Sequence, residues 1–299
     1  MHSNYYSFKL LDENNIFWVA LIYRDKSQKL SHFIHFMDDF SLLIPEFSNF
    51  IKIMKKSISY FGVLVWITIF SIAMAYLESA VVVYLRALTY PEGFTFPMQP
   101  IGRNIALTEI FREAATIIML IGAGILAGKN FTERFAWFLY SFAIWDIFYY
   151  VFLKILINWP SSLLTWDILF LIPVTWVGPV ISPVIVSLTM ILLAGFIIYF
   201  NSKNLKVRIN WQIWTLLING SLVLILSFIW DYSSFILSHY SLSQIWSMPD
   251  NHALYDLAQQ YVPQSFNWGL FGVGELIILI AITWFAWHYF AILKKNFPK

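Results

Sequence analysis

The stretch ISYFGVLVWITIFSIAMAYLESAVVVYLRAL, residues 58–88, decides the fold class of this chain. Its only charged side chains are Glu78 and Arg86, and it exceeds the ~20 apolar residues that a helix needs to cross the ~30 Å core of a bilayer. Five more stretches have the same character, and the predicted spans run over about 58–88, 104–127, 135–157, 176–200, 211–237 and 267–293. The sequence therefore predicts an all-α integral membrane protein, a bundle of six transmembrane helices.

The composition supports this fold class and excludes several kinds of function. Of the 299 residues, 59% are apolar and 12% are charged, whereas an average soluble domain has roughly half apolar and about a quarter charged residues. A net charge of +2, with no basic run interleaved with aromatic side chains, excludes a nucleic-acid partner. The chain has no cysteine to ligate a metal, and Gly122-x-Gly124 follows no predicted strand, so no nucleotide site is indicated. The indicated partner is the lipid bilayer.

Lys and Arg are distributed unevenly between the predicted loops. They cluster before the first span, between the second and third, between the fourth and fifth, and after the sixth, whereas residues 158–175 and 238–266 contain none. Loops rich in Lys and Arg stay on the cytoplasmic side of a membrane. The sequence therefore predicts that both termini are cytoplasmic and that the protein lies in the plasma (inner) membrane.

Residues 1–56 differ in character from the membrane domain predicted for residues 57–299. Apolar side chains recur at three- or four-residue steps over 33–54, which predicts an amphipathic helix on the cytoplasmic face of the membrane. Residues 5–24 are compatible with a small hairpin. Because a Met-Lys-Lys start directly precedes the first span, residues 1–53 are also open to being a dispensable extension.

The first span has a rival interpretation. Lys55-Lys56, the apolar stretch and Ala73-Met74-Ala75 resemble a signal peptide with its cleavage site. Apolar residues continue through Val83, which favours an uncleaved helix.

Two outer segments are expected to be helical without crossing the membrane. The apolar run over about 161–173 is too short to span, and serines at its start can cap a helix, so a short re-entrant or interfacial outer helix is predicted. In the longest loop, 238–266, a second short helix is predicted over about 252–260.

Ionisable residues inside the spans carry the most information about function, since each costs roughly 2.5–3.5 kcal/mol to insert at the centre of a helix. On the predicted topology, every such carboxylate lies between the middle of the membrane and its outer surface. Glu109, Arg112 and Glu113 share one helix face because they stand at i, i+3 and i+4. The sequence predicts an outward-facing, carboxylate-rich cavity that binds its ligand through Glu78, Glu109, Arg112, Glu113, Asp146, Lys154, Asp167 and Glu275.

Internal neutralisation is the alternative to such a cavity, since buried acids paired with buried bases also hold helices in register. Seven acids stand in or near the spans, namely Glu78, Glu109, Glu113, Asp146, Asp167, Asp231 and Glu275. The four bases are Arg86, Arg103, Arg112 and Lys154. Full pairing leaves three acids, which must be protonated, hydrated or bound to a cation.

Three classes of function remain open. The leading one is the binding or movement of a proton or cation, because carboxylates at membrane depth serve that purpose. Its central residues are Glu78, Glu109, Glu113 and Asp146. Arg112 would orient them, and residues 158–175 would cover the cavity. The second class is a membrane-embedded enzyme that uses Mg²⁺ or Mn²⁺ on a lipid-linked or periplasmic substrate. The third is a structural or assembly subunit whose charges are packing pairs.

Small residues predict where helices pack closely. Gly124 and Gly128 stand four residues apart in the second span, and Gly269, Gly272 and Gly274 precede Glu275 in the sixth. Small residues at such spacing let two helix backbones approach each other.

Overall fold

The computed structural model of the chain describes residues 6–12, 15–21, 60–97, 99, 102–172, 174–203, 205–247 and 252–296. The described residues fall into two units, a β-hairpin near the N-terminus and a helical unit that begins at Tyr60. Each unit is described by itself below.

The N-terminal hairpin consists of β1 (Tyr6–Asp12) and β2 (Asn15–Leu21), which pair antiparallel. It confirms the hairpin predicted within residues 5–24. The amphipathic helix predicted over 33–54 lies outside the described residues.

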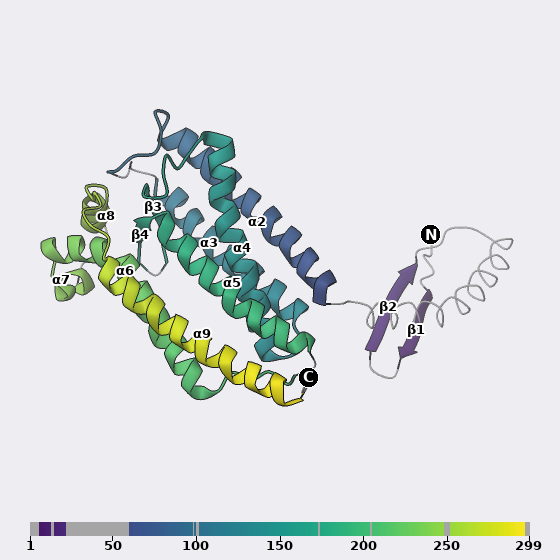
Figure 1. Cartoon of the computed structure of the whole chain (residues 1–299). Coiled ribbons are helices and arrows are strands. Elements are labelled where there is room, and N and C mark those ends of the chain that lie inside the picture. Colours follow the sequence, from purple (N-terminus) through teal and green to yellow (C-terminus); the bar gives the residue numbers. More distant parts are fainter. Residues whose placement is uncertain are drawn as a thin grey trace, which may run out of the picture. The chain divides into compact units, whose positions relative to one another are not determined.

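Six helices of the helical unit are long and apolar enough to cross a membrane. They are α2 (Tyr60–Thr89), α3 (Arg103–Ala127), α4 (Phe131–Ile157), α5 (Ile181–Ser202), α6 (Trp211–His239) and α9 (Trp268–Asn296). Figure 1 shows them running alongside one another as a bundle. The six predicted long apolar helices are confirmed, and each bound lies within five residues of its prediction.

Asparagine side chains begin two of these helices. The side-chain oxygen of Asn130 accepts a hydrogen bond from the backbone N–H of Glu133 (3.1 Å), and the Glu133 carboxylate accepts one from the N–H of Lys129 (2.9 Å). Asn210 begins α6 in the same way, since its oxygen accepts from the N–H of Ile213 (2.9 Å). These caps satisfy N–H groups that have no partner within the helix, and so fix where each helix starts.

The segment after α4 differs from its prediction. Instead of a short helix over about 161–173, the chain forms β3 (Trp166–Phe170) and β4 (Trp176–Pro179), which pair antiparallel. The predicted helix is wrong because the prediction used the length of the apolar run, whereas the aromatic and β-branched side chains of both strands favour extended backbone. Strand β4 also takes residues 176–179 from the predicted fourth span, so α5 begins at Ile181.

The β3–β4 hairpin packs against the helices, with β4 next to α5 and α6. Asp167 in β3 is 2% exposed and Val177 in β4 is 1% exposed. The Trp176 ring stacks on the ring of Phe228 in α6, with centroids 5.9 Å apart and planes at 12°. Non-helical backbone is tolerated at membrane depth only where protein covers it and its N–H and C=O groups are paired. The pairing of β3 with β4 supplies partners for part of this backbone, and β4 is buried from Val177 to Pro179.

Helix α4 packs against α2, α3 and α5, while α6 packs along α9. A large apolar cluster joins α5, α6 and α9, and a smaller one around Ala75, Leu120 and Trp145 joins α2, α3 and α4.

Two short helices, α7 (Leu242–Ser247) and α8 (His252–Ala258), follow α6. Helix α8 confirms the helix predicted in this loop, whereas α7 had no counterpart in the prediction.

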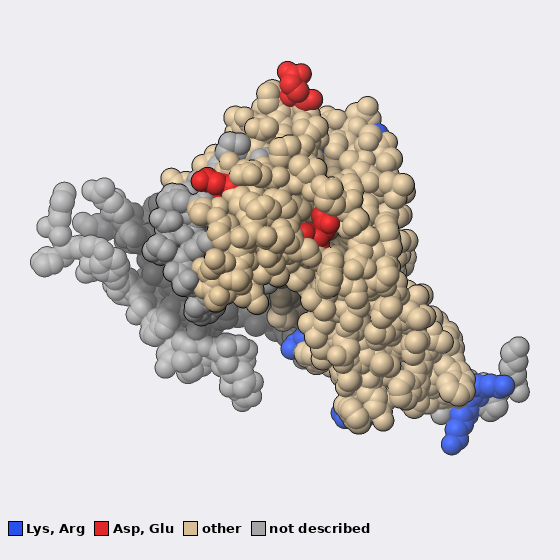
Figure 2. Space-filling model, turned by 90° about the vertical axis from the view of Figure 1, so that its left-hand side faces the viewer, with Lys and Arg blue, Asp and Glu red and all other residues tan. Residues whose placement is uncertain are grey.

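Basic side chains gather at one end of the helical unit. The ends of α5 and α9 meet where the rings of Phe200 and Tyr289 lie 5.3 Å apart, and the Tyr289 hydroxyl donates to the carbonyl oxygen of Arg208 just before α6. The starts of α4 and α6 meet where the rings of Phe135 and Trp214 lie 4.8 Å apart. The Lys and Arg residues at this end are Lys129, Arg134, Lys203, Lys206, Arg208, Lys294 and Lys295. Figure 2 shows Lys and Arg mainly at the lower end of one face, and Asp and Glu in its upper half.

The flanks of the bundle expose large apolar side chains. Leu126 is 90% exposed, and Trp66 and Ile155 are each 71% exposed. Such a surface is unfavourable in water and is suited to contact with lipid tails. Together with the six long apolar helices, it defines a multi-pass membrane protein.

Gly124 lies where α3 approaches α4 closely. A Cβ at Gly124 would lie 2.7 Å from the carbonyl oxygen of Arg134 and 2.9 Å from the Cβ of Phe138. In the sixth span, a Cβ at Gly274 would lie 2.8 Å from Cγ of Leu224 in α6. A Cβ at Gly272 would have no atom within 4 Å. The packing prediction is thus confirmed for Gly124 and Gly274, while Gly272 has open space.

Gly124→Ala should reduce the free energy of unfolding by about 1–3 kcal/mol, because the new methyl group meets rigid backbone atoms. Gly122→Ala is the matched control on the same helix, where a Cβ has nothing within 4 Å. It should leave stability unchanged or raise it by up to ~1 kcal/mol. Thermal unfolding of the purified variants in detergent measures both, and equal effects would contradict the close approach of α3 and α4.

Candidate functional site

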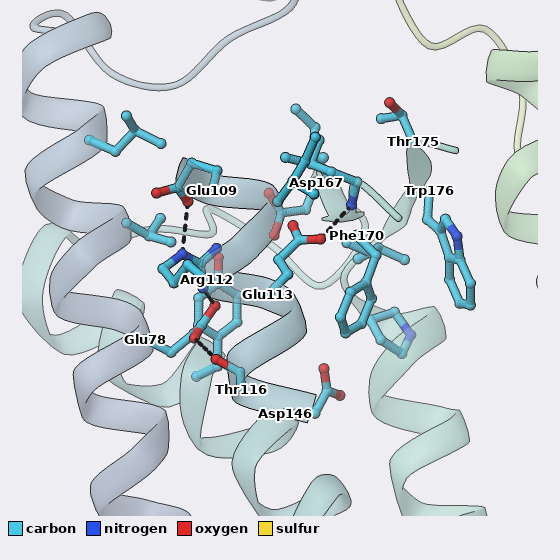
Figure 3. A pocket seen from close by; sticks show the side chains of 18 of the residues that line it. Glu78, Glu109, Arg112, Glu113, Thr116, Asp146, Asp167, Phe170, Thr175 and Trp176 are labelled. Atoms are coloured by element: carbon cyan, nitrogen blue, oxygen red, sulfur yellow. Dashed lines mark hydrogen bonds and ion pairs between the residues drawn. The ribbon is translucent and has the colours of Figure 1, made fainter. Parts of the chain in front are cut away.

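A cavity of about 500 Å³ lies between α2, α3, α4, α5, α6 and the β3–β4 hairpin. Its walls come from the second halves of α2, α4 and α6 and the first halves of α3 and α5, so it lies at the end opposite to the cluster of Lys and Arg. Most of the lining side chains are aromatic or aliphatic. The predicted site residues that line it, labelled in Figure 3, are Glu78, Glu109, Arg112, Glu113, Asp146 and Asp167.

Arg112 of α3 holds two of these carboxylates. Its Nε donates to Oε2 of Glu109 (2.8 Å), one turn earlier on the same helix, and its Nη1 donates to Oε1 of Glu78 on α2. The Thr116 hydroxyl donates to the other oxygen of Glu78 (3.1 Å), as the dashed lines in Figure 3 show. One guanidinium therefore fixes the direction of two acids and ties α2 to α3.

A second ion pair joins α2 to β3. Nη2 of Arg86 lies 3.1 Å from Oδ1 of Asp167, and both residues are buried. The guanidinium also lies over the rings of Trp159 (3.8 Å to the centroid) and Phe94 (4.5 Å). Burial raises the pKa of Asp167 to about 6, and the positive charge of Arg86 opposes that rise. The two aromatic faces add attraction for the cation and keep it directed at β3.

Glu113 and Asp146 line the cavity without a basic partner among the described side chains. Oε2 of Glu113 accepts a hydrogen bond from the backbone N–H of Leu171 (2.9 Å), between β3 and β4. Oδ2 of Asp146 accepts one from the Ser187 hydroxyl of α5 (2.8 Å). A neutral donor lowers the cost of burying a carboxylate but does not cancel its charge. These two acids can therefore pair with a positively charged ligand.

Two predicted site residues lie elsewhere. Lys154 is exposed, and its Nζ donates to the backbone oxygens of Asn158 (3.4 Å) and Pro160 (3.0 Å). Glu275 of α9 lines a second cavity of about 170 Å³. Topology predicts how deep a residue lies in the membrane but not the direction in which its side chain points. For this reason the sequence placed Lys154 and Glu275 in the cavity, whereas neither side chain lines it.

Sequence reasoning missed three donors in the cavity wall. Nε1 of Trp145, Nε1 of Trp176 and Nη1 of Arg86 are buried, and none of the described residues offers them a hydrogen-bond acceptor. Phe170 lies between the two indoles, with its ring centroid 6.3 Å from that of Trp145 and 5.6 Å from that of Trp176. The available signals were the position of Trp145 next to Asp146 and the Trp-rich sequence around β3 and β4.

Comparison of the chain with known protein families, with curated proteins and with solved structures finds no match. The function proposed below is therefore inferred from the geometry and charge of the cavity.

Asp167 should give the protein a pH dependence of definite sign. The pKa of this carboxyl is raised from 3.8 to about 6 in the folded chain, so on acidification the folded chain takes up a proton here before the unfolded chain does. The contribution of Asp167 to the free energy of unfolding therefore increases as the pH falls from about 6 to about 4, and is smallest above that window.

Asp167→Asn cannot titrate, so the difference in unfolding temperature, wild type minus variant, should rise as the pH falls through this window. Ser161→Ala, at an exposed residue without a titratable side chain, is the control and should show no such trend. If the unfolding temperature of the wild type minus that of Asp167→Asn grew instead as the pH rises, the charge of Arg86 rather than burial would dominate the pKa of Asp167.

Proposed function

We propose that this chain is a multi-pass protein of the plasma (inner) membrane that binds a small organic cation in an outward-facing cavity. One observation carries the proposal: Glu113 and Asp146 line the cavity, and their hydrogen-bond donors are neutral. The cavity wall holds five carboxylates and two guanidiniums, so its excess charge is negative when the acids are ionised. A cleft lined by one sign of charge concentrates ligands of the other sign.

The proposed orientation rests on the separation of charge between the two ends of the bundle. Seven Lys and Arg residues gather at one end, and the cavity lies at the other. Loops rich in Lys and Arg stay on the cytoplasmic side. In this orientation both termini are cytoplasmic, and the cavity is reached from the outer side of the membrane.

The size and lining of the cavity favour an organic cation over a bare metal ion. Small-molecule sites usually measure about 300–1,000 Å³, and this cavity measures about 500 Å³. In the part of the chain that the structure describes, no three His, Asp or Glu side chains are close enough together to hold a metal ion. The aromatic rings of Trp145, Tyr149 and Phe170 instead line the cavity, where rings can offer apolar contact and attraction for an ammonium group.

The free donors add a second requirement for the ligand. The indole N–H groups of Trp145 and Trp176 and one N–H of Arg86 are buried in the wall with no acceptor among the described residues. A buried donor left unpaired costs about 1–3 kcal/mol. The proposed ligand therefore carries hydrogen-bond acceptors beside its positive charge.

The other two functions predicted from the sequence fit these observations less well. A metal-dependent enzyme has no cluster of ligating side chains in its favour among the described residues. A structural role requires a base beside each buried acid, and within the described part of the chain Glu113, Asp146 and Glu275 have none. A bound cation supplies the missing charge for the two acids of the cavity.

Orientation can be tested cleanly because the chain has no cysteine. Ser202→Cys lies at the end of α5, and Ser241→Cys lies just after α6, at opposite ends of the bundle. In intact cells, a membrane-impermeant maleimide should label Ser241→Cys and leave Ser202→Cys unlabelled until the cells are opened. The reverse pattern would overturn the proposed orientation.

Cation binding can be tested with acetylcholine and carbamoylcholine, which carry carbonyl acceptors beside a fixed positive charge, with uncharged 3,3-dimethylbutyl acetate as the matched ligand. At about 100 times Kd the cations should stabilise the purified protein by ~2.7 kcal/mol, which is measured as a rise in its unfolding temperature. Glu113→Gln should abolish the rise without changing the fold, because it removes the charge and keeps an acceptor for the N–H of Leu171.

Glu92→Gln is the matched control, since it removes a carboxylate at the same end of the bundle but outside the cavity. It should bind the cations as the wild type does. Equal stabilisation by 3,3-dimethylbutyl acetate, or full binding by Glu113→Gln, would contradict the proposed function.

A further inference from the structure

We propose that Glu275 and Thr189 form a second site, separate from the outward-facing cavity, that binds and releases a proton. This site lies in the cavity of about 170 Å³, whose walls come from α4, β4, α5, α6 and α9. The proposal does not rest on cation binding in the larger cavity, because the ligand here is the proton itself.

The contacts of Glu275 fit a carboxyl group that carries a proton. The side chain is 6% exposed, and its Oε2 accepts one hydrogen bond, from the Thr189 hydroxyl (2.9 Å). Oε1 is buried, and no described residue provides a hydrogen-bond partner for it. Burying an ionised carboxylate without a counter-charge costs several kcal/mol. Protonation removes that cost and needs no further ligand, whereas a metal ion would need several.

The surroundings of Glu275 offer no charge that would keep it ionised. None of the residues that line this cavity from α4, β4, α5 or α6 is acidic or basic, and its other side chains that can form hydrogen bonds are Thr189, Ser221 and the indole N–H of Trp176. The buried carboxylate of Glu133 differs from that of Glu275 because both of its oxygens have a hydrogen-bond donor. Its carboxylate accepts hydrogen bonds from the Tyr60 hydroxyl (2.8 Å) and from the backbone N–H of Lys129 (2.9 Å).

A thin wall separates Glu275 from the larger cavity. Trp176, Val186, Met190 and Phe228 line both cavities. Helix α5 lies between two buried acids, since Ser187 donates to Asp146 on one side and Thr189 donates to Glu275 on the other. The smaller cavity has room for several water molecules. Small movements of the shared side chains would therefore let a proton pass between the outward-facing cavity and Glu275.

Infrared spectroscopy of the purified protein in lipid nanodiscs tests the proposal. At neutral pH the wild type should show the C=O stretch of a protonated, buried carboxyl. The band should shift when H₂O is replaced by D₂O and should disappear at alkaline pH. Glu275→Gln should lose the Glu275 component of this band, while a component from Asp146, which also has one hydroxyl donor and no base among the described residues, would remain. Thr189→Val should keep the Glu275 component at a higher frequency, because the hydrogen bond to the carboxyl is lost.

Glu133→Gln is the control and should leave the band unchanged, since it removes a buried acid with two donors at the opposite end of the bundle. A band of unchanged intensity in Glu275→Gln would overturn the assignment. A band that neither exchanges in D₂O nor titrates would show a sealed structural acid rather than a proton site. Loss of cation binding in the larger cavity would not produce either result, so the two proposals fail separately.

Discussion

Ionisable side chains at membrane depth must find partners inside the protein, and the half of this bundle that holds the larger cavity is organised by that constraint. Arg112 joins α3 to α2 through Glu78, and Arg86 joins α2 to β3 through Asp167. Both guanidiniums thereby hold the walls of one cavity in place. The acids that these two bases do not reach, Glu113 and Asp146, are directed by neutral donors and have no base paired with them in the described part of the chain.

The β3–β4 hairpin makes this arrangement possible. A helix in its place would use its backbone N–H groups internally. The turn between two strands leaves the N–H of Leu171 free to bind Glu113, while β3 supplies Asp167 and β4 supplies Trp176 to the same cavity. An irregular segment at membrane depth is tolerated only where protein covers it, and here it forms one wall of the cavity. The hairpin thus explains why the cavity lies between α3, α4 and α5.

The number and positions of the long helices could be predicted, because length and apolarity alone decide whether a helix can cross a membrane. The hairpin could not be, because its strands pair with each other and pack on α6, and a run of apolar residues does not reveal those partners. The excess of acids over bases indicated that some acids would lack a base. It did not indicate which ones, because membrane depth says nothing about the direction of a side chain. Lys154 therefore points away from the cavity, and Glu275 lines a different one.

The reactivity of one cysteine placed in the cavity tests most directly whether the site attracts cations from the outer side. Thr175 lies between β3 and β4 and lines the cavity, and the absence of native cysteine makes Thr175→Cys the only reactive thiol. The rates of modification by a cationic and by an anionic methanethiosulfonate reagent of similar size, added from outside, should differ by at least ~10-fold in favour of the cation. Equal rates, or faster reaction with the anion, would contradict an outward-facing cavity that binds cations.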